Sequence, residues 1–204
     1  VLAEEASTIL MDILEEPIGK HDQYLAAFGG VTHLEIDNDG AVEVTPEPLC
    51  EETLEELQNC VLLFYTGIRR SASDVLADQS KAVSNGNGDV AEALHRVKEI
   101  GGRIRGALRN GDLHGFGELL DDHWQSKKQL SQKVSSGQVD RWYELAQANG
   151  ALGGKLIGAG GGGFFMFCCH NGDKPRLRQA MAAEGLREMR FSVEPEGSKV
   201  LVNI

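Results

Sequence analysis

KLIGAGGGG, residues 155–163, runs directly into FFMFCC, residues 164–169, and the rest of the chain is organised around this stretch. Five of the six residues from Gly158 to Gly163 lack a side chain, so the backbone there can adopt positive φ and approach another segment closely. The apolar and aromatic run that follows predicts a buried strand. The turn before that strand either presents backbone N–H groups to an anion or braces a neighbouring loop, and a plain tight turn is the alternative.

Neither common nucleotide-binding pattern fits these glycines. A P-loop requires Lys followed by Ser or Thr after its last glycine, whereas Phe164 follows here. The dinucleotide fingerprint precedes a helix, whereas these glycines precede a predicted strand. The stretch therefore needs the rest of the chain to interpret it.

Composition and charge set the class of protein. The chain has 204 residues, 41% of them hydrophobic and 25% charged, which is typical of a soluble globular protein that buries a core of its own. The net charge of -11 argues against a nucleic-acid or anionic-membrane surface but leaves room for a local basic pocket. No apolar run reaches the roughly 18 residues of a membrane span, and no signal peptide is visible.

The cysteines indicate a reducing compartment. Cys50, Cys60, Cys168 and Cys169 form no CxxC pair and have no metal-ligand spacing. We therefore expect a cytoplasmic protein whose thiols pack as small hydrophobic groups.

Apolar periodicity predicts strands and helices that interleave along the chain. This order favours an α+β fold, with a mixed or antiparallel sheet and helices packed on one face. Helices are predicted over 2–14 (ended by Pro17), 51–59, 74–82, 90–110, 112–130, 139–149 and 173–185; strands over 31–36 and 41–44 as a hairpin, and over 60–65, 164–169, 189–193 and 200–204.

Residues 17–24, PIGKHDQY, place a cation, an imidazole and a carboxylate together after a helix end. Asp22 is a candidate general base for a sugar hydroxyl, with Lys20 as the nearby cation that keeps it ionised. The alternative is a solvated loop with an incidental charge pair.

A second polar segment follows the predicted strand 60–65. Thr66, Gly67, Arg69 and Arg70 offer hydroxyl and guanidinium donors that suit a phosphate or a sugar. The alternative is a surface loop that caps the next helix through Ser71 or Ser73.

The histidines on the predicted helices lack metal-ligand spacing. His95, His114 and His123 are therefore interpreted as surface or partly buried side chains. The segment HWQSKK, residues 123–128, is interpreted as a solvated helix end, with substrate contact as the alternative.

Three segments together resemble one family. GKHDQY at 19–24, YTGIRRSA at 65–72 and KLIGAGGGG at 155–163, with HW at 123–124 and GALGGK at 150–155, look like the sugar-1-kinases of the GHMP superfamily, most closely the D-glycero-D-manno-heptose 7-phosphate kinases. The resemblance implies a GHMP kinase C-terminal domain of ferredoxin-like type over residues 51–204. Residues 1–50 would then be a remnant of the N-terminal kinase domain.

The resemblance also implies the chemistry. Such kinases transfer the γ-phosphoryl group of ATP, with Mg²⁺, to the anomeric hydroxyl of a sugar phosphate, and they need alignment and charge placement more than covalent chemistry. Asp22 would be the catalytic base, assisted by Lys20, and the substrate pocket would contain Thr66, Gly67, Arg69 and Arg70, with no metal-ligating residue. The nucleotide side would be bordered by Gly158, Ala159, Gly160, Gly161, Gly162 and Gly163.

The chain departs from the family pattern at its start. Family members carry a loop of the type Pro-x-x-x-Gly-Leu-Gly-Ser-Ser-Ala before the first helix seen here, and it wraps the triphosphate at a helix N-terminus. We therefore expect that the chain begins part-way through a larger protein and that this piece alone is inactive. A fucose, galactose or arabinose 1-kinase, and a sugar-phosphate-binding module without catalysis, remain alternatives. The partners expected are small molecules, not nucleic acid or membrane, and the oligomeric state stays open.

Overall fold

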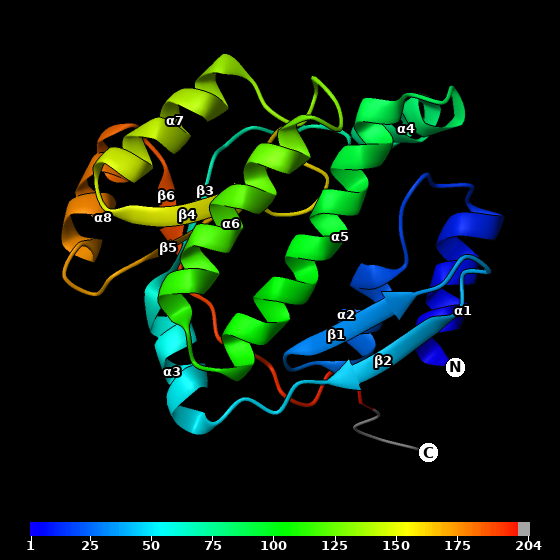
Figure 1. Ribbon diagram of the computed structural model, residues 1–204, viewed down its shortest axis with the longest axis horizontal. Coiled ribbons are helices and arrows are strands. Elements are labelled where there is room, and N and C mark those ends of the chain that lie inside the picture. Colours follow the sequence, from blue (N-terminus) through cyan, green and yellow to red (C-terminus); the bar gives the residue numbers. More distant parts are fainter. Residues whose placement is uncertain (200–204) are drawn as a thin grey trace. The chain divides into compact units, whose positions relative to one another are not determined.

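The computed structural model describes residues 1–199, and they divide into two compact units (Figure 1). The first unit contains residues 1–50 and 192–199, and the second contains residues 51–191. Residues 192–199 thus lie with the first unit, although the sequence placed them with the second. The strand expected over 200–204 lies outside the described residues.

The first unit consists of helices followed by a hairpin. Helix α1 (Leu2–Thr8) continues as the π-helix η1 (Ile9–Ile13), so the predicted helix is confirmed, although it ends before Pro17. Helix α2 (His21–Phe28) follows, and it was not predicted. Strands β1 (Thr32–Ile36) and β2 (Val42–Pro46) form the predicted antiparallel hairpin, whose turn is closed by the N–H of Ala41 donating to Asp37 Oδ1 at 2.8 Å.

Residues far apart in the sequence meet closely in this first unit. The N–H of Gly30 donates to the carbonyl of Glu194 at 2.7 Å, and the N–H of Ser198 donates to that of Ala26 at 3.0 Å. A Cβ atom at Gly29, where φ is +67°, would lie 2.3 Å from the backbone nitrogen of Gly197. Only glycine permits both that φ and that approach.

The second unit is built on a four-stranded sheet. Its strands are β3 (Val61–Tyr65), β4 (Ala151–Leu156), β5 (Phe164–Cys169) and β6 (Arg187–Met189), in the order β4-β5-β3-β6. Every neighbouring pair is antiparallel, so β5 and β6 run parallel to each other on either side of β3. Helix α8 (Lys174–Ala183) connects β5 to β6. The predicted α+β fold with an antiparallel sheet is confirmed.

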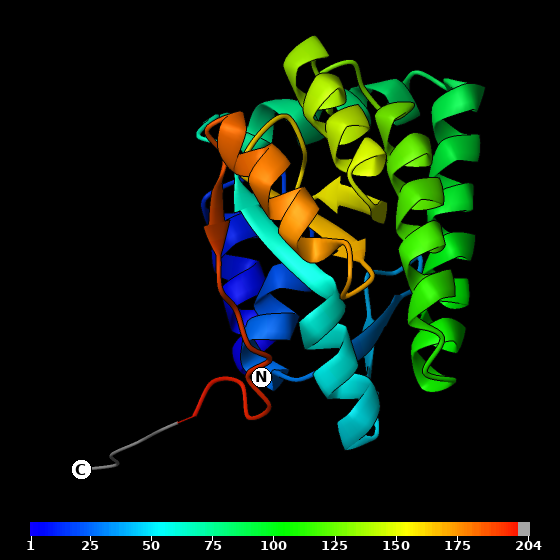
Figure 2. The same cartoon turned by 90° about the vertical axis from the view of Figure 1, so that its left-hand side faces the viewer.

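The remaining helices of this unit are largely those predicted from periodicity. They are α3 (Glu51–Cys60), α4 (Ala72–Ser84), α5 (Gly88–Arg109), α6 (Leu113–Lys128) and α7 (Gly137–Ala148). Side chains of Ser71, Asn87, Asp112 and Ser136 cap the N-termini of α4 to α7 by accepting backbone hydrogen bonds. Helices α5 and α6 lie side by side, joined by a tight turn (Figure 2).

The core lies on both faces of the sheet because β5 is buried on both. Phe165, Phe167 and Cys169 pack on one face with the buried side chains of Trp124 and Met181. Residues of opposite parity on the strands pack on the other face, where the cluster contains Val61, Phe116, Leu120 and Cys168. The prediction of a continuous buried strand at 164–169 is confirmed.

Strand β4 was missed, and the reason is physical. Its sequence ALGGKL has two glycines and no strict alternation, which weakens the strand signal. A Cβ atom at Gly153 would lie 2.2 Å from the carbonyl oxygen of Gly117 on α6, so the helix and strand backbones approach too closely for any side chain. The strand predicted over 189–193 is also wrong in its bounds, because β6 contains only Arg187–Met189.

Candidate functional site

Asp22 lies in the first turn of α2, so the expected solvated loop is wrong for residues 21–24. Its side chain is 79% exposed, and its Oδ1 lies 3.0 Å from Nε2 of His21. A carboxylate in the first turn of a helix is favoured by the partial positive charge of that terminus. The side chain is accessible to a small molecule.

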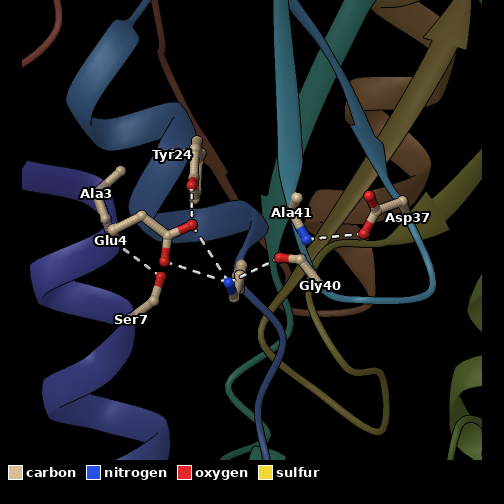
Figure 3. Close-up of polar contacts among 8 residues, drawn as sticks. Ala3, Glu4, Ser7, Tyr24, Asp37, Gly40 and Ala41 are labelled. Carbon is tan, nitrogen blue, oxygen red and sulfur yellow. Dashed lines mark hydrogen bonds and ion pairs between the residues drawn. The ribbon is translucent and has the colours of Figure 1, made fainter. Parts of the chain in front are cut away.

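Lys20 lies in a polar network of the first unit, whose members Glu4, Tyr24 and Gly40 are labelled in Figure 3. Its Nζ donates to both carboxylate oxygens of Glu4 at 3.2 Å and to the carbonyl of Gly40 at 2.8 Å. The hydroxyl of Tyr24 also donates to Glu4. That hydrogen bond, together with Lys20, lowers the pKa of Glu4, and the same bond raises the pKa of Tyr24 to about 12.

This network changes the role expected of Lys20. Its ammonium group is bound to Glu4 on α1 and to the carbonyl of Gly40, so it joins α1 to the hairpin turn. No pattern in the sequence indicated Glu4 as this partner. The contacts of Asp22 are with His21 instead. Glu4 and Tyr24 are the residues that sequence reasoning missed here, since their meeting depends on how α1 and α2 pack.

The loop after β3 is tied to the glycine-rich loop. The hydroxyl and the N–H of Thr66 both donate to the carbonyl of Gly163 at 2.9 Å, and Thr66 is buried. Gly67 has a φ of +73°, which explains the glycine at this bend. Arg69 and Arg70 are exposed, and neither forms a hydrogen bond or ion pair with any residue in the range 1–199. Ser71 caps α4, as the alternative interpretation required.

The glycine-rich loop connects β4 to β5, and neighbouring loops hold it in place. The N–H of Gly161 donates to the carbonyl of Val134 at 2.7 Å, and the N–H of Gly163 donates to that of Ile68 at 3.0 Å. A Cβ atom at Gly162 would lie 2.6 Å from the carbonyl oxygen of Ile68. The loop therefore braces its neighbours, whereas Gly158 and Gly163 have no atom within 4 Å of a built Cβ and so border open space.

Basic side chains gather beside this loop, and the interpretation of residues 123–128 as a solvated helix end is wrong. Lys127 is buried, and its Nζ donates to the carbonyl of Gly158. Lys155 Nζ lies 3.4 Å from Nε2 of His123, and both side chains are half-buried. A usable signal existed, because Phe116, Leu120, His123 and Lys127 recur at helical spacing on one face of α6.

Burial shifts the pKa values of this basic cluster, which we define as His123, Lys127 and Lys155. Removal from water lowers the pKa of each lysine to about 8, and Lys127 adds to the shift of Lys155 by repulsion. Burial, followed by the two lysines, lowers the pKa of His123 to about 3. At neutral pH the histidine is therefore uncharged and the lysines are largely protonated.

Among residues 1–199, no group of three or more His, Cys, Asp or Glu side chains is arranged to hold a metal ion. No helix of that range is long and apolar enough to cross a bilayer.

Part of the second unit matches a known protein family in sequence. Residues 104–187 match the family model described as GHMP kinases C terminal. Residues 104–187 of the second unit are thus similar to the C-terminal domain of GHMP kinases, the family that the sequence motifs resemble.

Individual relatives are also kinases. The chain is 35% identical, over 89% of its length and 53% of the relative's, to the D-glycero-alpha-D-manno-heptose 7-phosphate kinase of Campylobacter jejuni. It is 29% identical, over 89% of its length and 56% of the relative's, to the galactokinase of Thermococcus kodakarensis. The solved structure of a D-glycero-D-manno-heptose 1-phosphate kinase from Bacteroides thetaiotaomicron superposes with a TM-score of 0.71 at 25% identity, covering 98% of this chain and 55% of that one. The chain thus spans about half the length of these relatives.

Proposed function

We propose that this chain is part of an ATP-dependent sugar kinase that phosphorylates the anomeric hydroxyl of D-glycero-D-manno-heptose 7-phosphate. The observation that carries the proposal is the joining of the arginine-bearing loop to the glycine-rich loop through Thr66 and Gly163. This contact brings a predicted substrate segment and a predicted nucleotide segment together within one unit. The likeness to a heptose 7-phosphate kinase supports the substrate class.

The proposed chemistry assigns a role to each segment. Asp22 accepts the proton of the sugar hydroxyl while that oxygen attacks the γ-phosphorus and the bond to the departing ADP breaks. Within residues 1–199, its exposed carboxylate in the first turn of α2 contacts His21 as its one ion-pair partner. Lys20 keeps the Asp22 segment in place through Glu4 and Gly40, so we assign it a positioning role.

The second unit would hold the phosphorylated ligands. Thr66 and Gly67 shape the loop after β3. Arg69 and Arg70 are exposed and form no hydrogen bond or ion pair within residues 1–199, so they are available to an anionic substrate. Residues 158–163 would border the nucleotide. Mg²⁺, bound with ATP, would neutralise charge on the transferring group, and no residue of this chain is assigned to it.

We also propose that the protein is located in the cytoplasm. Cys60, Cys168 and Cys169 carry reduced thiols, which fits a cytoplasmic enzyme of sugar-phosphate metabolism.

A kinase for an unphosphorylated sugar is the second candidate, and the likeness to a galactokinase favours it. Such a substrate gives Arg69 and Arg70 no phosphate to bind. A sugar-phosphate-binding module without catalysis is the third, and it predicts binding without turnover.

A phosphate-transfer assay separates these candidates. The longest protein that carries this chain is supplied with ATP and Mg²⁺, and with heptose 7-phosphate, galactose or fucose in turn. We expect turnover on the heptose phosphate and a loss of about 10²- to 10⁴-fold in kcat for Asp22→Asn, since general base catalysis is worth that much. Glu35→Gln, an exposed carboxylate of β1, is the matched control and should retain full kcat.

Each other result has a distinct meaning. Turnover on galactose or fucose alone would select the second candidate, and binding of heptose 7-phosphate with no turnover would select the third. Equal kcat for Asp22→Asn and the wild type would refute the base assignment.

A further inference from the structure

The basic cluster of His123, Lys127 and Lys155 has more hydrogen-bond donors than the acceptors that residues 1–199 supply to it. Lys127 uses one of its three N–H donors on the carbonyl of Gly158. Lys155 donates to Nε2 of His123, which fixes the neutral imidazole with its proton on Nδ1. That Nδ1 is buried and has no hydrogen-bond partner. The cluster is therefore left with unused donors on all three side chains.

The cluster also lacks a counter-charge. Neither lysine forms an ion pair with any carboxylate in residues 1–199, although the whole chain carries 31 acidic residues. Burying an ammonium group away from water is unfavourable unless an opposite charge accompanies it. The lowered pKa of each lysine reflects that uncompensated burial.

We infer that the basic cluster is a binding site for a phosphoryl group, held by the ammonium groups of Lys127 and Lys155 beside the glycine-rich loop. A phosphate monoester or the end of a polyphosphate carries two negative charges and several acceptor oxygens, which suits two cations with spare donors. The position follows from the bond between Lys127 and Gly158 and from the place of Lys155 at the end of β4. The phosphate has two possible sources, the sugar substrate or the nucleotide.

A purely structural role accounts for only part of the geometry. Lys127 anchors the glycine-rich loop through Gly158, and a single hydrogen bond suffices for that. It leaves Lys155 unexplained, because a second cation beside the first is repulsive. A phosphate ligand explains both lysines, and it differs from the earlier assignment of Arg69 and Arg70 as the phosphate readers.

The test is a titration of the 204-residue chain with inorganic phosphate, followed by the backbone amide NMR signals of residues 158–163. We expect saturable shifts at pH 7 and low ionic strength. Lys155→Met should weaken binding by at least about tenfold, since a hydrogen bond to a charged group is worth that much. Lys155→Arg should retain binding, and Lys98→Met, an exposed lysine of α5, should bind as the wild type does.

Lys155→Met is preferred to Lys127→Met because Lys155 makes no bond to the loop that reports binding. Three outcomes would overturn the inference. The first is the absence of a saturable shift in the wild type, and the second is equal phosphate affinity of Lys155→Met and Lys98→Met. The third is that Arg69→Met loses phosphate binding whereas Lys155→Met retains it.

Two further titrations identify the source of the phosphate. A loss of affinity for heptose 7-phosphate in Lys155→Met assigns the site to the sugar substrate, and a loss for ADP assigns it to the nucleotide. Both results support the site, and only this last step rests on the proposed kinase function. If the chain binds phosphate through Lys155 while the whole protein shows no kinase turnover, the phosphate site stands and only the proposed kinase function is refuted.

Discussion

At the residue scale, the surroundings of His123 lower the pKa of its imidazole ring. Its ring is half-buried on α6, its Nε2 accepts from Lys155, and its Nδ1 is enclosed without a partner. Protonation would place a third positive charge beside two lysines, which is why the pKa of His123 falls to about 3. The folded protein therefore holds this histidine neutral across the physiological range.

This residue should make the second unit sensitive to mild acid. The pKa of His123 is about 3 when folded, against an ordinary value of 6.5, so its contribution to stability is complete above pH 6.5 and is lost as pH falls toward 3. From pH 7 to pH 5 the wild type should lose at most about 2 kcal/mol of unfolding free energy through this group. Both lysines are charged in the folded and unfolded states throughout that window, so they do not contribute.

Urea unfolding followed by tryptophan fluorescence measures this loss, since both tryptophans, Trp124 and Trp142, lie in the second unit. His123→Gln should show a smaller loss over the same interval. An identical slope for His123→Gln and the wild type would contradict the neutral buried histidine.

At the element scale, the contact between α6 and β4 depends on missing side chains. Gly153 on the strand faces the carbonyl oxygen of Gly117 on the helix, and a Cβ at Gly117 would in turn lie 2.7 Å from Leu152. The N–H of Gly154 donates to the hydroxyl of Tyr143 on α7. Close approach also brings Lys155, at the end of β4, beside His123 on α6. The glycines of β4 are thus part of how the basic cluster is assembled.

Gly153→Ala should destabilise the second unit by about 3 kcal/mol, because its methyl group has no space between strand and helix and overpacking costs on this order. The same fluorescence-detected urea unfolding gives the value. Gly101→Ala on α5 is the matched control, since nothing lies within 4 Å of its Cβ, and a helical alanine should gain up to about 1 kcal/mol. Similar effects of the two substitutions would show that close packing is not what requires Gly153.

At the scale of the whole molecule, the two units differ in how the chain builds them. The second unit is one continuous segment, residues 51–191, and contains its sheet and core clusters. The first combines residues 1–50 with 192–199, joined by backbone hydrogen bonds at Gly30 and Ser198. The first unit therefore needs the distant segment, and the second keeps its strand pairing without it.

Truncation after Phe191 tests this organisation. It removes the bonds from Gly30 to Glu194 and from Ser198 to Ala26, so amide exchange at Gly30 should quicken by about 10- to 100-fold, as expected for the loss of one or two net hydrogen bonds. Amides of β3, in the middle of the sheet, should keep their protection. Loss of protection in β3 to the same degree would show that residues 192–199 support the second unit as well.

Elements whose signals are local could be predicted from the amino-acid sequence. The periodicity of α5 and α6, the hairpin at 32–46 and the apolar run of β5 follow from short-range sterics and from the need to bury one face. The motifs at 19–24, 65–72 and 155–163 likewise indicated a resemblance to the GHMP kinases. The match of residues 104–187 to the model of the GHMP kinase C-terminal domain supports that resemblance.

The contacts between residues far apart in the chain could be seen only in the folded structure. It paired Lys20 with Glu4, tied Thr66 to Gly163, turned ALGGKL into a strand beneath α6, and buried Lys127 next to Lys155. A side chain's partners depend on the packing of segments far apart in the chain, whereas its propensity depends on its neighbours in sequence. For this reason the elements were predictable and the electrostatics of the candidate site were not.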